Sequence, residues 1–175
     1  MPELPETETI ARELDRRVSS AGIVSVAVPK PDVLREVSPR TLARRASGAT
    51  IVHCWRRAKL VVLDLSSGDR LVVQPRFTGA LLVDEGQLDP REHAYGAVRF
   101  GLADGRALLY RDVRRLGTVA LMNPARFARC SAALGPEPLD PAFGPGELSA
   151  ILGGSRAAVK RVLMDQRRLA GVGAV

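Results

Sequence analysis

The sequence is poor in the residues that build metal sites, disulfides and membrane spans. It has two cysteines, Cys54 and Cys130, and two histidines, His53 and His93. The cysteines form no C-x-x-C pair and the histidines do not complete a ligand set at zinc spacing, so we expect no metal and no cofactor in this chain. No uninterrupted apolar run reaches about 18 residues, and no signal-peptide pattern opens the chain. These absences predict a cytoplasmic protein without a membrane partner.

Charge, by contrast, is abundant and unbalanced. The 26 lysines and arginines exceed the 19 acidic residues and give a formal net charge of +7. Such a charge favours an acidic partner, but by itself it does not separate nucleic acid from a membrane surface or an acidic protein. The positions of the arginines in the sequence are needed to distinguish among these three kinds of partner.

Apolar periodicity predicts an α+β fold with an N-terminal helix, an antiparallel β-sandwich or barrel, and helices at the end. Apolar residues recur at spacings of three and four from residue 6 to about residue 20, and again from residue 146 onward. A short helix is expected over residues 35–45, and the turn sequences at 66–69 and 104–105 suit β-hairpins. The predicted strands are residues 23–28, 49–55, 60–65, 71–73, 80–83, 98–102, 107–110 and 118–121.

A rigid, proline-rich connection over residues 134–139 separates the strands from the last helices. Strand character ends near Leu121, and we place a domain boundary between residues 129 and 133. Residues 1–131 are then one domain and residues 132–175 a second, smaller one.

The first eight residues carry the strongest chemical signal. Pro2 is small enough for methionine aminopeptidase to remove Met1, which leaves a secondary amine one residue before the carboxylate of Glu3. An α-amino group titrates near ~8, so part of it is nucleophilic at neutral pH and forms an iminium ion with a sugar aldehyde carbon. That iminium stays cationic because a secondary amine has no second proton to lose. The alternative is an ordinary helix start, with Pro5 and Glu6 in the first turn.

The sequence Pro-Glu-Leu-Pro-Glu-Thr-Glu at residues 2–8 resembles the start of bacterial formamidopyrimidine-DNA glycosylases, also called 8-oxoguanine DNA glycosylases. The resemblance extends over nearly the whole chain. It implies that Pro2 is the nucleophile, that Glu3 is a proton donor and that Glu6 belongs to the active site. It also implies that residues 1–131 are the catalytic domain.

The motif Arg-Arg-Ala-Lys at residues 56–59 lies between two predicted strands and indicates a hairpin loop with three cations. It resembles the family's Arg-Arg-x-Lys loop. The resemblance implies that Lys59 reaches the damaged nucleotide and its phosphate and transfers a proton. A solvated basic turn without a role is the alternative.

Two later motifs resemble the family segments that enter the DNA helix. Residues 74–79, Gln-Pro-Arg-Phe-Thr-Gly, stand where the family reads His-Leu-Gly-Met-Ser-Gly, which implies that Phe77 fills the gap left by a flipped base. Residues 111–117, Arg-Asp-Val-Arg-Arg-Leu-Gly, resemble Asp-Pro-Arg-Arg-Phe-Gly, so Arg114 is expected to pair with the opposite base. Leu116 is expected to wedge beside it without an aromatic face. A core phenylalanine at position 77 is the alternative.

Residues 155–166 resemble the opening of the family's helix–two-turns–helix module. This implies DNA phosphate contacts by Lys160 and then by Arg156, whereas the charged outer face of an ordinary helix is the alternative. Upstream, a family His-x-His motif falls on Tyr95 and Ala97, of which Tyr95 can still donate to a phosphate.

The resemblance stops at the last residues, where Ala174 replaces a phosphate-binding asparagine. It implies a C-terminally truncated chain with a partial helix–two-turns–helix domain and without the family's four-cysteine zinc finger. We therefore expect Val159, Leu163 and Leu169 to be partly uncovered.

Three functions remain open at this point. The first is a base-excision-repair DNA glycosylase with abasic-site lyase activity, a monomer of the bacterial cytoplasm and nucleoid. It removes oxidised purines from double-stranded DNA through a Schiff base on Pro2. The second is a truncated, weakly DNA-binding fragment without turnover. The third is an N-terminal-proline tautomerase, a class of short βαβ chains that acts on small keto acids.

Overall fold

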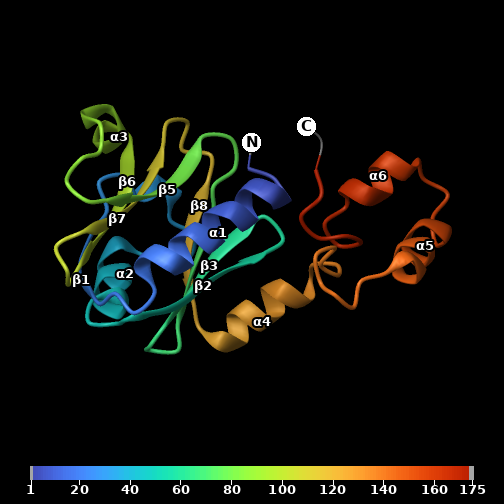
Figure 1. The fold of residues 1–175 in the computed structure, drawn as a ribbon, viewed down its shortest axis with the longest axis horizontal. Helices are drawn as coiled ribbons and strands as arrows, with labels where there is room; N and C mark the ends of the chain where they lie inside the picture. Colours follow the sequence, from blue (N-terminus) through green and yellow to red (C-terminus); the bar gives the residue numbers. More distant parts are fainter. Residues whose placement is uncertain (1, 174–175) are drawn as a thin grey trace.

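The computed structural model of the chain describes residues 2–173. Two four-stranded sheets form a sandwich, and α4, α5 and α6 extend from one side of it (Figure 1). The helices are α1 Leu4–Val18, α2 Pro39–Ala46, α3 Pro90–Ala94, α4 Pro124–Ala132, α5 Pro145–Gly153 and α6 Val159–Met164, with a 3-10 helix η1 at Pro31–Val33. The strands are β1 Ile23–Ala27, β2 Ile51–Arg57, β3 Leu60–Leu65, β4 Arg70–Gln74, β5 Gly79–Asp84, β6 Gly96–Leu102, β7 Ala107–Asp112 and β8 Thr118–Met122.

The two sheets have the strand orders β1-β6-β7-β5 and β2-β3-β4-β8, and neighbouring strands in both are antiparallel. Every strand predicted from the sequence is present, with small shifts at the ends, and both predicted hairpin turns join neighbouring strands. The α+β class is therefore confirmed. Because a βαβ unit requires parallel strands, the topology of the described residues contradicts the tautomerase hypothesis.

Helix α1 lies on the sandwich beside β2 and β3 (Figure 1). Its buried face includes Ala11, Leu14 and Val18, the apolar stripe that the periodicity predicts. The helix begins at Leu4 rather than at residue 6, and Pro5 falls in its first turn, where a missing N–H costs no helical hydrogen bond. The start of α1 therefore directs the first residues of the chain toward one end of the sandwich.

Two helical segments differ from the prediction. Helix α4 is not indicated by the apolar periodicity; it begins where the Asn123 side chain accepts a hydrogen bond from the Arg126 N–H at 2.9 Å. Its Phe127 packs edge-on against Trp55, with ring centroids 5.6 Å apart. Residues 155–158 form a loop before α6, although the sequence predicts continuous helical character there.

The last described segment, residues 166–173, returns to the start of α1. The Gly135 N–H donates to the Gln166 carbonyl at 2.8 Å, which ties this segment to the proline-rich connection. Gly171 has a φ of +83° and packs against Leu4, whose Cδ1 would lie 2.7 Å from a Cβ at position 171. The close approach and the left-handed φ both require glycine there.

The three apolar residues that we expect to be partly uncovered differ in their exposure to solvent. Val159 is 58% exposed and Leu163 is half-buried, as predicted, whereas Leu169 is buried at 4% exposure. The prediction is wrong for Leu169 because residues 166–173 fold back onto the rest of the chain. The division between residues 131 and 132 falls at the end of α4 and stays a prediction. None of the described helices combines the length and apolar character needed to cross a membrane.

Two crossings between the sheets lie at the same end of the sandwich. Residues 75–78 connect β4 to β5, and residues 113–117 connect β7 to β8. Because β4 pairs with β8 and β5 pairs with β7, the crossings leave from neighbouring strand ends: Gln74 faces Thr118, and Gly79 faces Asp112. The topology therefore places residues 75–78 beside residues 113–117.

The ends of these crossings are packed too closely for a side chain. Tyr110 is fully buried, and a Cβ at Gly79 would lie 2.7 Å from its hydroxyl oxygen. A Cβ at Gly117 would overlap the same oxygen and would lie 2.6 Å from the Gln74 carbonyl oxygen. Close packing around the Tyr110 hydroxyl thus depends on glycine at both positions.

We expect Gly117→Ala to lower the free energy of unfolding by about 1–3 kcal/mol, because the added methyl group has no space beside Tyr110. The measurement is urea-induced unfolding followed by circular dichroism. Gly146→Ala is the control: nothing lies within 4 Å of a Cβ at Gly146, and alanine favours the helix that contains it. Equal stabilities of the two variants would contradict the packing argument.

Candidate active site

Residues from distant parts of the chain meet at one cavity beside the first described residues. The cavity has a volume of about 200 Å³. Three of the site residues predicted from the sequence, Pro2, Lys59 and Phe77, lie in its wall together. Its lining residues are Pro2, Lys59, Gln74, Arg76, Phe77 and Gln166.

Glu3 lies next to this cavity and is buried at 5% exposure. Its carboxylate forms an ion pair with the Lys59 ammonium through Oε2, and Oε1 lacks a hydrogen-bond partner among the described residues. The Gly173 backbone packs against this pair so closely that a Cβ there would overlap the Glu3 carboxylate. A buried carboxylate and an ammonium in direct contact form a polar centre from which most solvent is excluded.

Glu6 occupies a different position. Its carboxylate is exposed and accepts a hydrogen bond from the Glu3 N–H at 2.9 Å. Hydrogen bonds from the backbone N–H groups of Glu6 and Glu3 lower the pKa of the Glu6 carboxyl. Glu6 thereby caps α1 and holds the backbone of Glu3, and it does not line the cavity. Its assignment to the active site stays a prediction.

The hairpin between β2 and β3 corrects the expectation of a loop with three cations. Arg56 and Arg57 belong to β2, and their side chains are only 4% and 13% exposed. Ala58 and Lys59 alone form the turn. The arginines are buried because carboxylates face them, so the alternative of a solvated basic turn is wrong for both.

Glu137 is the main partner of these arginines. Its carboxylate accepts hydrogen bonds from Arg56 at 2.5 Å, from Arg57 at 2.8 Å and from the Ala58 N–H at 2.5 Å. Burial opposes ionisation of Glu137, but these hydrogen bonds outweigh it and lower the pKa of the carboxyl. Arg56 also binds Glu8 on α1 at 2.8 Å. The hairpin that carries Lys59 is thus attached to both α1 and the proline-rich connection.

Arg57 attaches the hairpin to the end of α4. Its guanidinium donates to the Ser131 carbonyl at 3.0 Å, to the Leu134 carbonyl at 3.2 Å and to the Gly135 carbonyl at 3.0 Å. The Ser131 carbonyl lies in the last turn of α4, where carbonyl groups lack intrahelical donors, and the other two carbonyls follow the helix, so one guanidinium binds three carbonyl groups at this helix end.

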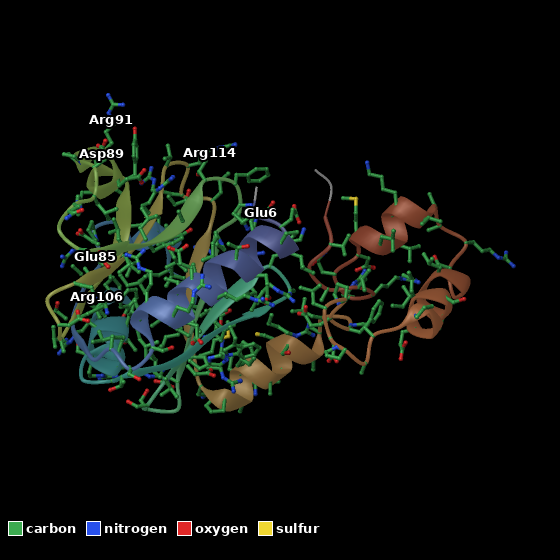
Figure 2. The ribbon with its side chains drawn as sticks, in the orientation of Figure 1. Glu6, Glu85, Asp89, Arg91, Arg106 and Arg114 are labelled. Carbon is green, nitrogen blue, oxygen red and sulfur yellow. The ribbon has the colours of Figure 1, made fainter. Side chains whose placement is uncertain are left out.

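Phe77 and Arg114 project from the two crossings between the sheets. Phe77 is 53% exposed, so the alternative of a core phenylalanine is wrong. The guanidinium carbon of Arg114 lies 5.3 Å from the Phe77 ring centroid, within cation–π range. Leu116, 39% exposed, lies on the crossing that carries Arg114. Figure 2 shows Arg114 and Glu6 toward the same edge of the molecule.

The remaining predicted residues do not line the cavity. Arg156 lies in the loop before α6, and Lys160 lies on α6; both are exposed. Tyr95 is 44% exposed at the end of α3. Ala174 lies outside the described residues. Among residues 2–173, no group of three or more His, Cys, Asp or Glu side chains is placed to hold a metal ion.

Gln74, Arg76 and Gln166 are cavity residues that the sequence reasoning missed. Gln166 accepts a hydrogen bond from the Gly171 N–H at 2.9 Å and donates to the Val172 carbonyl at 2.6 Å, so it shapes the segment that covers Glu3. Gln74 and Arg76 flank Phe77 in the motif that implied its role, which was the available signal for both. No local pattern indicates the contacts of Gln166.

We expect Glu137→Gln to lower the free energy of unfolding by about 2 kcal/mol near pH 7, because two buried guanidinium groups lose their shared carboxylate. The folded-state pKa of Glu137 is depressed, so its stabilisation is present above the unfolded-state pKa and is lost as the pH falls through the folded-state value. The difference between wild type and variant should therefore shrink toward about pH 3.

Urea-induced unfolding at both pH values measures this difference. Glu13→Gln removes an exposed pair with Arg17 and serves as the control, with an expected change below about 0.5 kcal/mol. A loss for Glu137→Gln that is equally large in acid would contradict the assignment.

Comparison with known proteins identifies the relatives of this chain. Residues 1–119 match the family model described as Formamidopyrimidine-DNA glycosylase N-terminal domain. The formamidopyrimidine-DNA glycosylase of Moorella thermoacetica is 42% identical over 175 residues, which cover 99% of this chain and 63% of that protein. The corresponding protein of Xanthomonas euvesicatoria is 40% identical over 173 residues, with the same coverage of 99% and 63%.

Solved structures agree with these relatives. A complex of Lactococcus lactis Fpg with DNA that contains an abasic site has a TM-score of 0.86 and 26% identity, and the match covers 98% of this chain and 62% of that one. A complex of the wild-type Lactococcus lactis protein with DNA that contains N7-benzyl-Fapy-dG has a TM-score of 0.86 and 27% identity, with coverage of 98% and 63%. This chain spans about 63% of the length of the curated relatives it matches. By sequence and by fold, the chain belongs to the formamidopyrimidine-DNA glycosylase family.

Proposed function

We propose that this chain acts as a DNA glycosylase and abasic-site lyase on oxidised purines in double-stranded DNA. The observation that supports this most directly is the cavity shared by Pro2, Lys59 and Phe77 beside the buried pair of Glu3 and Lys59. Base removal from a duplex requires a nucleophilic amine, a proton donor and a residue able to fill an emptied base position.

In the proposed mechanism the Pro2 nitrogen attacks C1′ of the flipped nucleotide, the glycosidic bond breaks, and the damaged base leaves with the proton that the amine gives up. Glu3 in its carboxylic acid form supplies a proton to the sugar ring oxygen as the ring opens, and Lys59 lies in contact with it. The cationic iminium then acidifies the C2′ proton. Loss of that proton expels the 3′ phosphate by β-elimination and cuts the strand, and water releases Pro2 from the product.

The exposed cations would hold the DNA. Arg114 suits bidentate hydrogen bonds to the base opposite the lesion, and Phe77 is exposed enough to enter the emptied position. Lys160 and Arg156 are exposed and suit contacts to phosphates. The partner is a duplex with an oxidised base or an abasic site, bound by a monomer at the nucleoid of the bacterial cytoplasm.

Borohydride trapping on a duplex with an abasic site tests the chemistry. We expect the wild-type chain, with Met1 removed, to form a covalent adduct, because reduction of the iminium fixes Pro2 to the sugar. Pro2→Gly, or retention of Met1, should strongly reduce the adduct, because a primary amine forms an imine that can lose its charge. An adduct that forms as fast in both variants as in the wild type would place the nucleophile elsewhere.

The second candidate is a DNA-binding chain without turnover. The observation in its favour is that Arg114, Arg156 and Lys160 are exposed, since contacts of such cations to phosphates need no turnover. Each phosphate contact contributes about −0.9 to the slope of log affinity against log salt concentration. Salt-dependent binding to the abasic duplex without any trapped adduct would favour this candidate.

We expect Glu3→Gln to slow trapping by about 100-fold or more, because an amide cannot donate a proton to the sugar as a carboxylic acid does. Affinity for the abasic duplex, measured by fluorescence anisotropy, should change far less than the trapping rate. A proportional loss of affinity and rate would show that Glu3 acts in binding instead.

A further inference from the structure

The two crossings between the sheets are joined by one buried carboxylate. Asp112 is 1% exposed, and its Oδ2 accepts hydrogen bonds from the Tyr110 hydroxyl at 3.1 Å and from the Gly117 N–H at 2.8 Å. Its Oδ1 accepts hydrogen bonds from the Thr78 hydroxyl at 2.5 Å and from the Arg114 N–H at 3.2 Å. Asp112 therefore binds both ends of its own crossing and the neighbouring one.

Thr78 provides the second half of this connection. Its hydroxyl oxygen, while donating to Asp112, accepts a hydrogen bond from the Arg114 N–H at 3.0 Å. Its carbonyl oxygen accepts from the Arg111 guanidinium at 2.9 Å. Thr78 directly follows Phe77 in the chain. The Thr78 hydroxyl is therefore one residue away from the Phe77 backbone and one hydrogen bond away from the Arg114 backbone.

The charge on Asp112 is maintained in spite of burial. Burial disfavours the ionised form, but hydrogen bonds from Thr78, Gly117 and Tyr110 outweigh it and lower the pKa of the carboxyl. Hydrogen bonds to a charged acceptor are stronger than those between neutral groups. The connection between the crossings is thus stronger than a typical loop contact.

The side chains beyond this connection also meet. The Arg114 guanidinium lies over the Phe77 ring at 5.3 Å, although both side chains stand on separate crossings. Each is attached to a backbone that hydrogen bonds of Thr78 and Asp112 hold in place.

We propose that Thr78 and Asp112 are positioning residues that couple Phe77 to Arg114, so that the two side chains enter the DNA helix as one unit and select the opposite base together. This rests on the proposed function, since it concerns the same DNA-binding surface. It adds a specificity role for Thr78, which does not line the cavity.

A double-mutant cycle on Phe77→Ala and Arg114→Ala measures the coupling. Fluorescence anisotropy gives the affinity of each variant for a duplex with a stable abasic-site analogue, tetrahydrofuran, opposite cytosine. Each single variant lowers the affinity by some factor. In the wild-type background, the product of these two factors should be about fivefold larger than the factor by which the double variant lowers the affinity, as is usual for residues in contact. In a Thr78→Val background this factor should fall to about one.

Thr78→Ser is the matched control, because serine keeps the hydroxyl and valine keeps the shape. We expect Thr78→Ser to retain the coupling factor and the ratio of affinities for cytosine and adenine opposite the abasic site. Thr78→Val should reduce that ratio by about threefold or more. Thermal unfolding of both variants checks that they fold.

Three results would overturn the proposal: a coupling factor that survives in Thr78→Val, an unchanged opposite-base ratio in Thr78→Val, or an equal loss of coupling in Thr78→Ser. The trapping assay on the wild-type chain distinguishes failure of this proposal from failure of the proposed function. A wild-type chain that binds the duplex and shows these couplings without trapping contradicts the lyase alone. A wild-type chain that does not bind the duplex contradicts both proposals.

Discussion

Pairing of β4 with β8 and of β5 with β7 determines where the groups of the cavity can lie, because it makes the chain cross between the sheets twice at the same end. The crossings pack around the buried Tyr110 hydroxyl, which leaves room only for glycine at Gly79 and Gly117. Phe77 and Arg114 consequently leave the sandwich side by side. The arrangement of the candidate site follows from sheet topology, since no local motif brings these residues together.

The arginines of this chain serve two physical purposes. Arg56 and Arg57 are buried and bind Glu137, and through these bonds the hairpin with Lys59 is held against α1 and the proline-rich connection. Arg114 and Arg156 remain exposed. Burial of an unpaired guanidinium would cost too much, and Glu8 and Glu137 balance the two buried arginines, so the formal charge of +7 is carried by the other side chains.

Membership of the formamidopyrimidine-DNA glycosylase family gives the departures from its motifs a structural meaning. Phe77 stands where the motif quoted above has methionine, and Leu116 stands where it has phenylalanine. The aromatic ring is therefore on the crossing between β4 and β5, and Arg114 lies over it at 5.3 Å. Hydrogen bonds of Thr78 and Asp112 between the crossings keep the ring and the guanidinium in contact. The aromatic surface is thus retained at this edge, although it comes from a different strand connection.

The strands, the apolar face of α1 and the candidates Pro2, Lys59, Phe77 and Arg114 could be predicted because periodicity, turn chemistry and short motifs are local properties of the chain. The burial of Arg56 and Arg57, the covering of Leu169 and the position of Gln166 in the cavity wall are seen in the folded chain alone. Each of these depends on a partner far away in the sequence. Such partners meet through strand order and the return of residues 166–173 to α1, which a local pattern does not encode.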